Sequence, residues 1–531
     1  MSRSTTAAFQ AIPALFIAFG LVAQDTPGAA PTVQRISLQV AVQTALKNNL
    51  QVGIAEQVRD ATKAGVLINQ GAFDWSLQSG ISFGHTKSAS IRSGPSQSSP
   101  GSLVTTDSEF TTTTRNINAS VTKPFEWGGN FSIAYGSQSP LYSSTDQSGK
   151  STIILPTGQV IGPTAFGPYN LNPFPYTSSL SATYIQSLLR NAGRDAASAQ
   201  LIVAKKGSIQ ADYIFQQSII TLVADTESKY WDLVFAKRNL ENKQQSLALA
   251  QKQLNENQIR VQVGTLAPIE VTSAEASAAQ REQDIIAAEA QLDNAKDALA
   301  RALYPDTTRP TNLDAEDAPS IEPFRFDEST AEKMALDKRL ELKFSKLDLE
   351  SKQALENSAN SKLKPQLDLN VGYVGASNTR ENFSGVNSDL TGFKYPGYNL
   401  GLTFSIPFAN RAARGGLSLA RANRRQSELS LRDQELGIIL QVRQAYRNLE
   451  AAAKGVAAAE KTRIFREKNL DAEKKKFDNG MSTNFFVLQR ADELDTARSA
   501  ELQARITYAK NVTTLEQSIG TLLEARKLEV K

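Results

Sequence analysis

The sequence predicts a mixed helix-and-strand membrane protein, in which long helical hairpins join β-strands that belong to a transmembrane barrel. Three observations support this fold class. Two long helical segments each turn back at a glycine, short segments alternate apolar and polar residues, and a duplication relates the two halves of the chain. The chain offers only four to six strands, and bacterial barrels begin at about eight. We therefore expect identical chains, three in our interpretation, to share one barrel.

The first helical hairpin is predicted over residues 195–303. Its ascending helix has an apolar residue at every seventh position: Leu240, Leu247, Leu254 and Val261. Its returning helix has apolar residues three and four apart: Ile285, Ala288, Leu292, Ala295, Leu299 and Ala302. Such spacing keeps one seam facing a partner helix. Gly264 gives the tip its backbone freedom, and Pro268 suits the first turn of the returning helix. At 1.5 Å per residue the ascending helix spans about 100 Å, far more than a globular domain needs.

A second copy of this hairpin is predicted over residues 414–523. Gly264 corresponds to Gly480, and Tyr230 to Tyr446, both at an offset of 216 residues. Residues 45–52 match residues 335–342 at an offset of 290, so the first half carries 74 additional residues before its tip. Chance similarity between Ala-rich helices is the alternative explanation. A repeat this long indicates two similar halves rather than a solenoid of short units.

The chain therefore divides into four predicted segments. These are a signal peptide at 1–30, a first repeat at 31–303, a connector at 304–326 and a second repeat at 327–531. The signal is predicted from one basic residue, Arg3, followed by an apolar stretch at 11–23 and small residues at possible cleavage sites. A short N-terminal helix is the alternative. A signal peptide predicts that the mature protein leaves the cytoplasm.

Composition excludes several classes of function. The net charge of +4 is small for 531 residues, so nucleic acid is not an expected partner. The chain has no cysteine, which excludes disulfides, thiolate metal sites and cysteine nucleophiles. His85 is the single histidine, so one chain cannot build a histidine-based catalytic pair or metal cluster. The sequence also has no glycine-rich phosphate motif. We expect neither an enzyme nor a bound cofactor.

The strands are predicted in two groups. In the first half, a helix at 37–49 capped by Ser37 and a helix at 50–70 precede strands at 73–84, 116–125, 131–135 and 180–187. In the second half, strands are predicted at 366–373 and 398–408. Three segments are rich in Ser, Thr, Gly or Pro, and we expect loops there: 85–114, 137–176 and 375–395.

Strands of about ten residues with one apolar face, short turns at one end and long polar loops at the other are typical of a transmembrane barrel. A soluble antiparallel sheet shows the same alternation and is the alternative. The hairpin at 116–135 has no counterpart in the second half. We predict that it adds two barrel strands per chain. The alternative is a hairpin folded outside or above the barrel.

At this point the sequence resembles the TolC family of outer-membrane efflux channels. The resemblance covers nearly all of residues 36–523, and its segments are SLQVAVQTALKNN at 37–49, QSLLRNAG at 186–193, VGT at 263–265, FSIPF at 404–408 and FDNG at 477–480. It implies a homotrimer with a β-barrel in the outer membrane and an α-helical barrel that crosses the periplasm. It further implies docking to a periplasmic adaptor and an inner-membrane transporter, with the chain as a passive exit duct for efflux or secretion.

The resemblance also suggests functional residues at the tips. In the family, acidic residues six and nine positions after a tip glycine can line the periplasmic mouth. Glu270 stands six after Gly264, whereas Phe486 and Gln489 occupy these positions at the second tip. Glu270 is therefore the aperture candidate, and a solvated residue in a first helical turn is the alternative. The tip turns are expected to dock the adaptor through Gly264, Thr265, Gly480 and Met481.

A second class of function remains open. A periplasmic adaptor or structural coiled-coil protein of an export complex also has a signal peptide and long helical hairpins. An adaptor is expected to have one hairpin flanked by β-domains. This sequence instead predicts two hairpins, each entered from strands, which favours the channel.

Overall fold

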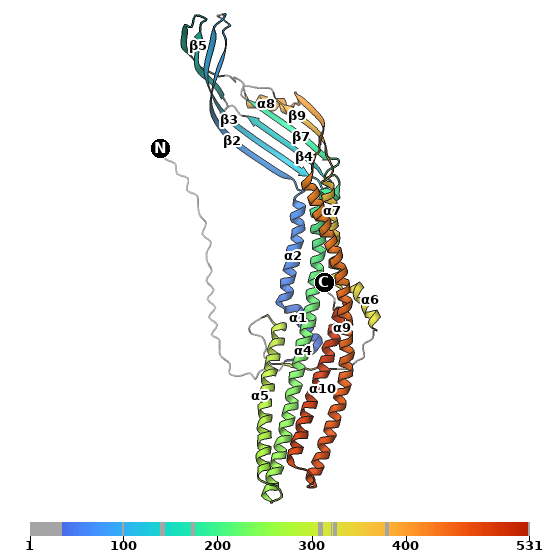
Figure 1. The fold of residues 1–531 in the computed structure, drawn as a ribbon. Coiled ribbons are helices and arrows are strands. Elements are labelled where there is room, and N and C mark those ends of the chain that lie inside the picture. The colour runs from blue at the N-terminus through green and yellow to red at the C-terminus, as the bar shows by residue number, and fades with distance from the viewer. Residues whose placement is uncertain are drawn as a thin grey trace, which may run out of the picture.

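The computed structural model describes residues 34–97, 100–138, 144–170, 176–305, 312–319, 321, 327–377 and 382–528. The protein is elongated, with a β-sheet at one end and long helices that turn back at the other (Figure 1). The predicted signal peptide at 1–30 lies outside the described residues, as does much of the predicted connector at 304–326.

Within the described residues, five helices belong to the first half. They are α1 (Leu38–Asn48), α2 (Leu50–Gly71), α3 (Arg194–Ala197), α4 (Ala199–Gln262) and α5 (Ile269–Leu303). The Ser37 hydroxyl caps α1 by accepting a hydrogen bond from the Val40 amide at 3.4 Å. The ascending helix of the hairpin begins with the short turn α3, and Ser198 separates this turn from α4.

The described part of the second half contains six helices. They are α6 (Glu328–Lys338), α7 (Leu340–Ser361), α8 (Phe383–Thr391), α9 (Arg411–Asp478), α10 (Asn484–Ile519) and α11 (Leu522–Ala525). Helix lengths in the two halves correspond: α1 and α6 have 11 residues each, and α2 and α7 have 22 each. The long helices α4 and α9 have 64 and 68 residues, and their returning partners α5 and α10 have 35 and 36. Both halves thus follow one order of helices.

The sheet is antiparallel throughout. Its strands are β2 (Ser76–Pro95), β3 (Leu103–Pro124), β4 (Gly129–Gln138), β5 (Ser144–Ile154), β6 (Val160–Asn170), β7 (Thr177–Ser187), β9 (Gln366–Ala376) and β10 (Pro396–Ser405). The spatial order is β10-β9-β7-β4-β3-β5-β6, and β2 pairs with the other edge of β3. β2 and β3 have 20 and 22 residues, about twice the length of the other strands.

The long strands divide the sheet into two parts. The lower sheet, next to the helices, contains residues 76–83 and 115–124 of β2 and β3 together with β4, β7, β9 and β10. The extension contains the remaining residues 84–95 and 103–114 of β2 and β3 together with β5 and β6. In Figure 1 the extension projects beyond the lower sheet, away from the helices. The predicted hairpin at 116–135 joins the lower sheet, between β2 and β7.

The structure contradicts all three predicted loops. Residues 85–95 and 103–114 continue β2 and β3, and the segment 137–176 contains β5 and β6. The segment 375–395 contains helix α8, which lies at the end of the sheet far from the long helices (Figure 1). Ser, Thr and Gly are poor indicators of a loop here because threonine is β-branched and favours strands. A strand that is polar on both faces also has no alternation to detect.

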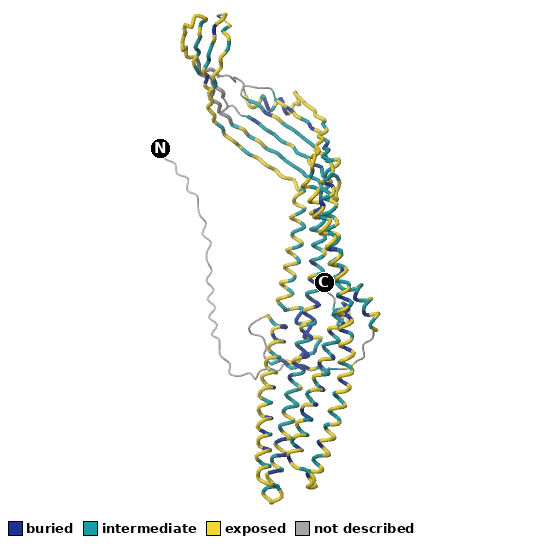
Figure 2. The backbone as a smooth tube through the Cα atoms, viewed as in Figure 1, coloured by how far each residue is buried: buried dark blue, intermediate teal, exposed yellow. Residues whose placement is uncertain are grey.

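Cross-strand pairing gives the lower sheet one continuous apolar face. One row of this apolar face stands in register across the strands and consists of Leu77, Val121, Ile133, Ala182, Tyr373 and Tyr398. The opposite face is mainly Ser, Thr, Asn and Gly, with Ile185 and Val374 as exceptions. The apolar face is exposed in the single chain, and Leu77 and Leu400 are 72% and 79% accessible. Figure 2 shows the exposed outer strands of this sheet in yellow.

Cationic side chains mark both ends of this apolar face. On β3 the apolar face runs between Arg115 and Lys123. The Arg115 guanidinium lies 5.6 Å from the centre of the Phe83 ring, and the Lys123 ammonium lies 5.8 Å from the centre of the Trp75 ring. Eight residues at 3.3 Å per residue give a band about 26 Å long along the strand. A strand tilted by about 35–45° would carry this band over about 20 Å of height, close to the apolar band of an outer-membrane barrel, which is about 25 Å tall with aromatic residues at both borders.

The helical body has a separate core at its waist. The short strands β1 (Gln34–Ile36) and β8 (Leu313–Ala315) pair in parallel beside α4 and tie the chain's beginning to the connector. Tyr230 is fully buried there, and its hydroxyl donates to Asp317 Oδ2 at 2.7 Å. Burial raises the pKa of the Tyr230 phenol, and the hydrogen bond to the Asp317 carboxylate raises it further. This phenol therefore stays protonated and serves as a fixed donor.

Ionic contacts hold the C-terminal segment to the body. Glu227 on α4 is fully buried, and Arg526 donates to both of its oxygens, from Nε at 2.6 Å and from Nη2 at 3.0 Å. Thr513 on α10 donates to the same carboxylate at 2.6 Å. Glu516 lies beside this pair, and its burial raises its pKa. The result is one half-buried cation shared between two carboxylates.

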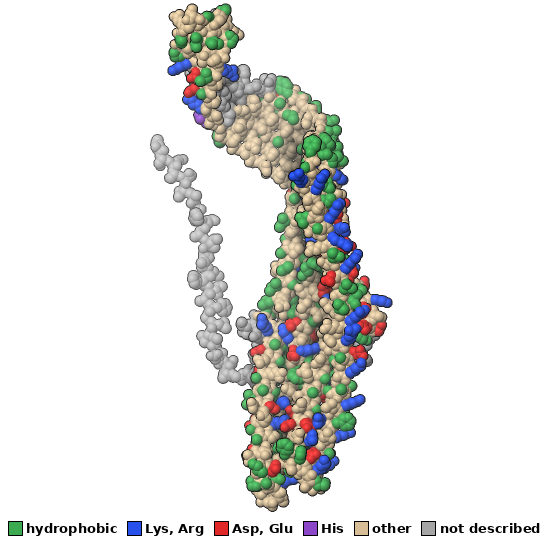
Figure 3. Space-filling view, in the orientation of Figure 1, with side chains coloured by type: hydrophobic (Ala, Val, Ile, Leu, Met, Phe, Trp, Pro, Cys, Tyr) green, Lys and Arg blue, Asp and Glu red, His purple; other side chains and the backbone are tan. Residues whose placement is uncertain are grey.

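Charge is distributed unevenly over the surface. In the view of Figure 3, lysine, arginine, aspartate and glutamate side chains cover the helical body, whereas the lower sheet shows almost none. Among the described residues, no helix combines the length and the apolarity needed to cross a membrane.

Candidate functional site

The two helix tips share one backbone motif. Gly264 and Gly480 have φ of +74° and +72°, the left-handed conformation that glycine adopts without steric cost. The next residue in each tip donates its amide five residues back, Thr265 to the Arg260 carbonyl and Met481 to the Lys476 carbonyl, both at 2.8 Å. This is the Schellman ending of a helix. The four residues that the sequence assigned to the tips thus form two equivalent turns.

Both tips expose apolar side chains. Val263 and Ile269 flank the first turn and are 67% and 66% accessible. At the second turn Met481 and Phe485 are 72% and 64% accessible, and Phe485 meets Phe486 edge to face. Large apolar side chains gathered at the end of a long rod make this end a candidate contact surface.

Glu270 lies in the first turn of α5 and is half-buried. Within the described ranges its carboxylate forms no hydrogen bond or ion pair. Its backbone carbonyl is the group that anchors it, because the side-chain amides of Asn257 and Asn484 both approach this oxygen at 3.5 Å. The backbone of Glu270 is thereby held near the tip, and its carboxylate is left available to bind a cation.

Buried amides join the two tips. Asn257 and Asn484 are fully buried, and Gln253 donates to both, at 3.1 Å and 3.4 Å. Outside this cluster, Arg260 of α4 donates to the Asp478 carboxylate of α9 at 2.6 Å and lies 4.7 Å from the centre of the Phe477 ring. The tips of the two hairpins are therefore connected to each other and do not end as separate rods.

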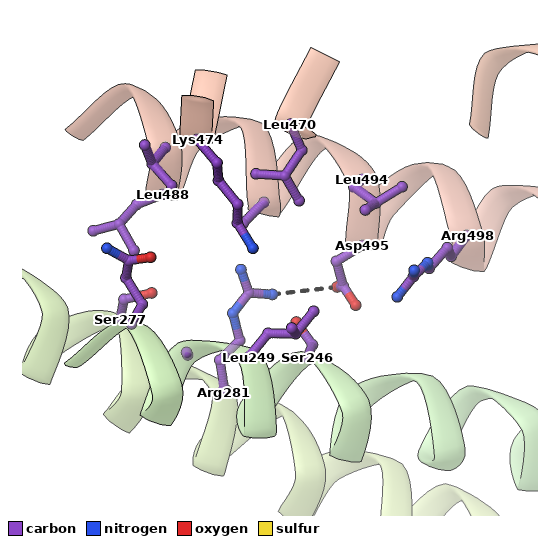
Figure 4. Close-up of a pocket in the computed structure, with 14 residues that line it drawn as sticks. Ser246, Leu249, Ser277, Arg281, Leu470, Lys474, Leu488, Leu494, Asp495 and Arg498 are labelled. Carbon is purple, nitrogen blue, oxygen red and sulfur yellow. Dashed lines mark ion pairs between the residues drawn. The ribbon is translucent and has the colours of Figure 1, made fainter. Parts of the chain in front are cut away.

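A buried charge network connects the hairpins above the tips. Asp495 of α10 is 8% exposed and pairs with two cations of the other hairpin. Its Oδ2 lies 3.5 Å from Nη1 of Arg281 on α5 and 2.5 Å from Nζ of Lys243 on α4. The Arg281 side chain is 7% exposed and also contacts Asp492. Figure 4 shows Arg281 rising from the first hairpin to meet Asp495 of the second.

The network borders a small cavity of about 30 Å³. Leu249, Leu470 and Leu494 line it together with the charged residues. Asp495 Oδ1 is buried and has no hydrogen-bond partner among the described residues. The cavity is large enough for a water molecule, which Oδ1 can accept from. We name Lys243, Arg281, Asp492 and Asp495 the inter-hairpin network.

Sequence reasoning missed this network, although a signal was present. The apolar spacing of α5 extends back from Ile285 to Ala278 and Ala274, and Arg281 occupies a seam position within it. A charge in an apolar seam predicts a buried partner on another element. Which element supplies the partner is a property of the tertiary fold, since Asp495 lies more than two hundred residues away.

The described residues contain no cluster of three or more histidine, aspartate or glutamate side chains able to hold a metal ion.

The helices and the sheet together offer three features: a long rod, an apolar and partly acidic tip, and a sheet with an apolar band. These features define the class of outer-membrane channels with a helical extension.

Comparison with known proteins gives the family. The profile of the outer membrane efflux protein family matches residues 186–303 and 332–521, which is more than half of the chain. The chain belongs to the outer membrane efflux protein family. Both long hairpins lie within the matched ranges, whereas the β2–β6 region does not.

Individual relatives agree with this family. The outer membrane protein TolC of Vibrio cholerae is 25% identical over 335 residues, covering 62% of this chain and 74% of that protein. The TolC of Escherichia coli is 24% identical over 338 residues, covering 61% of this chain and 66% of that protein. Among solved structures, that of CusC matches with a TM-score of 0.63 at 14% identity, covering 91% of this chain and 92% of that one.

Proposed function

We propose that this protein is the exit duct of a tripartite export assembly. Family membership makes it an outer-membrane efflux channel, located in the outer membrane and extending into the periplasm. In our proposal it works as a homotrimer, with the lower sheet in the lipid and the four long helices of each chain in a helical tube. A periplasmic adaptor docks at the tips, and an inner-membrane transporter supplies the energy.

One observation carries the proposal. The two hairpins leave the same sheet side by side, so the apolar band and the tips occupy opposite ends of one rod (Figure 1). Among the described strands, β2 and β10 form the edges of the lower sheet, and each lacks a neighbour on one side in the single chain. An open sheet edge is not tolerated in lipid, so copies of the chain must close it. Correspondence in helix order and length supports an origin of the two halves by duplication.

The experiment combines fractionation with electrical recording. We expect the protein in outer-membrane fractions as a heat-modifiable trimer, and the purified trimer to conduct ions in planar bilayers. The alternative function, a periplasmic adaptor or structural coiled-coil protein, predicts periplasmic material without conductance. That second outcome would reject the duct.

Docking at the tips has its own test. Cross-linkers attached to Met481→Cys are expected to capture a periplasmic protein with long hairpins. The same linker at Ser93→Cys, in the extension, is the matched control and is expected to capture none. The chain has no natural cysteine, so every adduct reports the introduced site. Equal capture at both positions would argue against tip docking.

A further inference from the structure

We infer that each chain contributes six strands to the membrane barrel, and that β10 of one copy pairs with the lower part of β2 in the next copy. This inference rests on the proposed function and adds the strand number, the seam and the width of the pore. Three copies with six strands each make a barrel of 18 strands, in the size class that leaves an aqueous channel.

The first argument is that the added hairpin carries the same two faces as its neighbours. Val121 of β3 and Ile133 of β4 stand in register on the apolar face. Asn118 and Ser132 stand on the opposite, polar face. A hairpin that folds outside a barrel has the same solvent on both of its faces. Such a hairpin does not need one apolar face and one polar face.

Strand length gives the second argument. β4, β7, β9 and β10 have 10, 11, 11 and 10 residues. A tilted strand needs about 9–11 residues to cross the apolar part of a bilayer. β2 and β3 are longer, but their apolar face ends at Phe83 and Arg115, at a common level. All six strands therefore cross the same band.

The third argument comes from the chemistry of the open edges. Exposed edges of sheets in water are normally blocked by charges, prolines or bulges. The edges of the extension are blocked: Lys87 and Arg92 lie on β2, whereas β6 has Pro163 and an irregular register with β5. The lower edges are not blocked. Residues 76–84 contain no charge and no proline, and β10 has a proline only at its first residue.

Strand direction gives the fourth argument. The six strands alternate in direction across the lower sheet, because every pairing in it is antiparallel. With an even number of strands, β10 runs opposite to β2, so the next copy continues the alternation without interruption. The apolar faces of Leu400 and Leu77 then join into one belt around the barrel. The extension, with its blocked edges, stands free above each copy.

The first test maps which strands line the lumen. Single cysteines are placed on the polar face of the added hairpin, as Asn118→Cys and Ser132→Cys, and on a second-half strand as Asn370→Cys. Each channel is recorded in a planar bilayer while a negatively charged methanethiosulfonate is added. We expect a conductance change at positions 118 and 132 of the same size as at 370. Ile133→Cys, on the apolar face, is the matched control and is expected to show no change.

The outcomes separate the two proposals. If the unmodified protein forms no channel, the proposed function fails. If the channel conducts and responds at position 370 but stays silent at 118 and 132, the hairpin lies outside the pore and the six-strand barrel is rejected.

The second test locates the seam. Thr403→Cys on β10 is combined in turn with Gln78→Cys and Ser82→Cys on β2, all on the polar face. We expect at least one pair to give covalent trimers under oxidising conditions, because facing residues of paired strands bring their Cβ atoms within disulfide range. The control combines Thr403→Cys with Ser90→Cys in the extension, and we expect no disulfide between copies for this pair. A cross-link from Thr403→Cys to Ser132→Cys on β4 would overturn the seam.

Discussion

The lower sheet and the helical hairpins that the inter-hairpin network joins place their apolar and charged side chains in opposite ways. The sheet places apolar side chains on one face and polar ones on the other, and its apolar face carries charge only at its two borders. The hairpins place charges outward, and a few charged groups, Arg281 and Asp495 among them, lie buried between helices. The difference teaches that the surrounding solvent decides which face is apolar.

The largest expected effect lies in the network. Asp495→Ala leaves two cations, Arg281 and Lys243, without the carboxylate that they share. Breaking a buried ion pair by removal of one partner costs about 3–5 kcal/mol. We expect a loss of this size in the free energy of unfolding of the helical body, measured by urea titration of the far-UV circular dichroism.

Two controls accompany this variant. Asp471→Ala removes one member of an exposed pair with Lys475, and its expected effect is below about 1 kcal/mol. The double variant Asp495→Leu with Arg281→Met replaces the buried pair by apolar groups and is expected to regain much of the lost stability. Equal effects of Asp495→Ala and Asp471→Ala would show that the network is not buried in the assembled protein.

The next effect concerns the sheet. Leu400→Lys places a cation in the apolar band, which costs about 2–4 kcal/mol at the middle of a bilayer. Ile91→Lys makes the same change on the extension, where Ile91 is already 71% exposed to water. We expect Ile91→Lys to change stability by less than about 0.5 kcal/mol. The stability of both variants is measured by folding them into lipid vesicles and following their heat-modifiable mobility in urea. Equal losses of stability for Leu400→Lys and Ile91→Lys would place the extension in the membrane.

A smaller, pH-dependent effect is expected at the waist. Burial raises the pKa of Glu516 above its ordinary value, and the neighbouring Glu227 carboxylate raises it as well, against the Arg526 guanidinium. A carboxyl group with a raised folded-state pKa adds stability below its ordinary pKa, and this stability is lost as the pH rises through the raised value. Glu516→Gln is therefore expected to stabilise the protein at neutral pH and to flatten the pH profile of unfolding. A profile unchanged by the substitution would contradict the assignment.

The smallest effect on stability belongs to Glu270, whose side chain has no partner among the described residues. We expect Glu270→Ala to leave unfolding unchanged and to reduce the preference of the channel for cations or its block by divalent cations. Glu275→Ala, which removes an exposed carboxylate five residues further along α5, is the matched control. Identical permeability ratios and block in planar bilayers for all three proteins would exclude Glu270 from the aperture.

The sequence predicts those elements of the fold whose local residue pattern has a single physical cause. Glycines at 264 and 480 predict the tip turns because a left-handed residue is needed there. Alternation over residues 75–83 predicts a strand because its two faces meet different media. β5 and β6 of the extension show no such alternation, so the sequence predicts loops there. The threonines of the extension, which favour strands, were the signal available.

The candidate site is less accessible to sequence reasoning. Helical phase shows that Arg281 stands in a seam, but it does not identify Asp495 as the partner. Likewise, the two asparagine amides at the Glu270 carbonyl come from different hairpins. Such contacts depend on how the hairpins pack, and a single sequence does not encode this as a local pattern.

The turn between β5 and β6 has a practical consequence. Leu155 and Gln159 close it through a hydrogen bond of 2.9 Å, and Gly158 adopts φ of +80°. It lies at the end of the extension, which points away from the long helices (Figure 1), so in the proposed orientation it faces the cell exterior. A peptide epitope inserted after Thr157 would be displayed to antibodies on intact cells, which makes this loop a handle for labelling living bacteria.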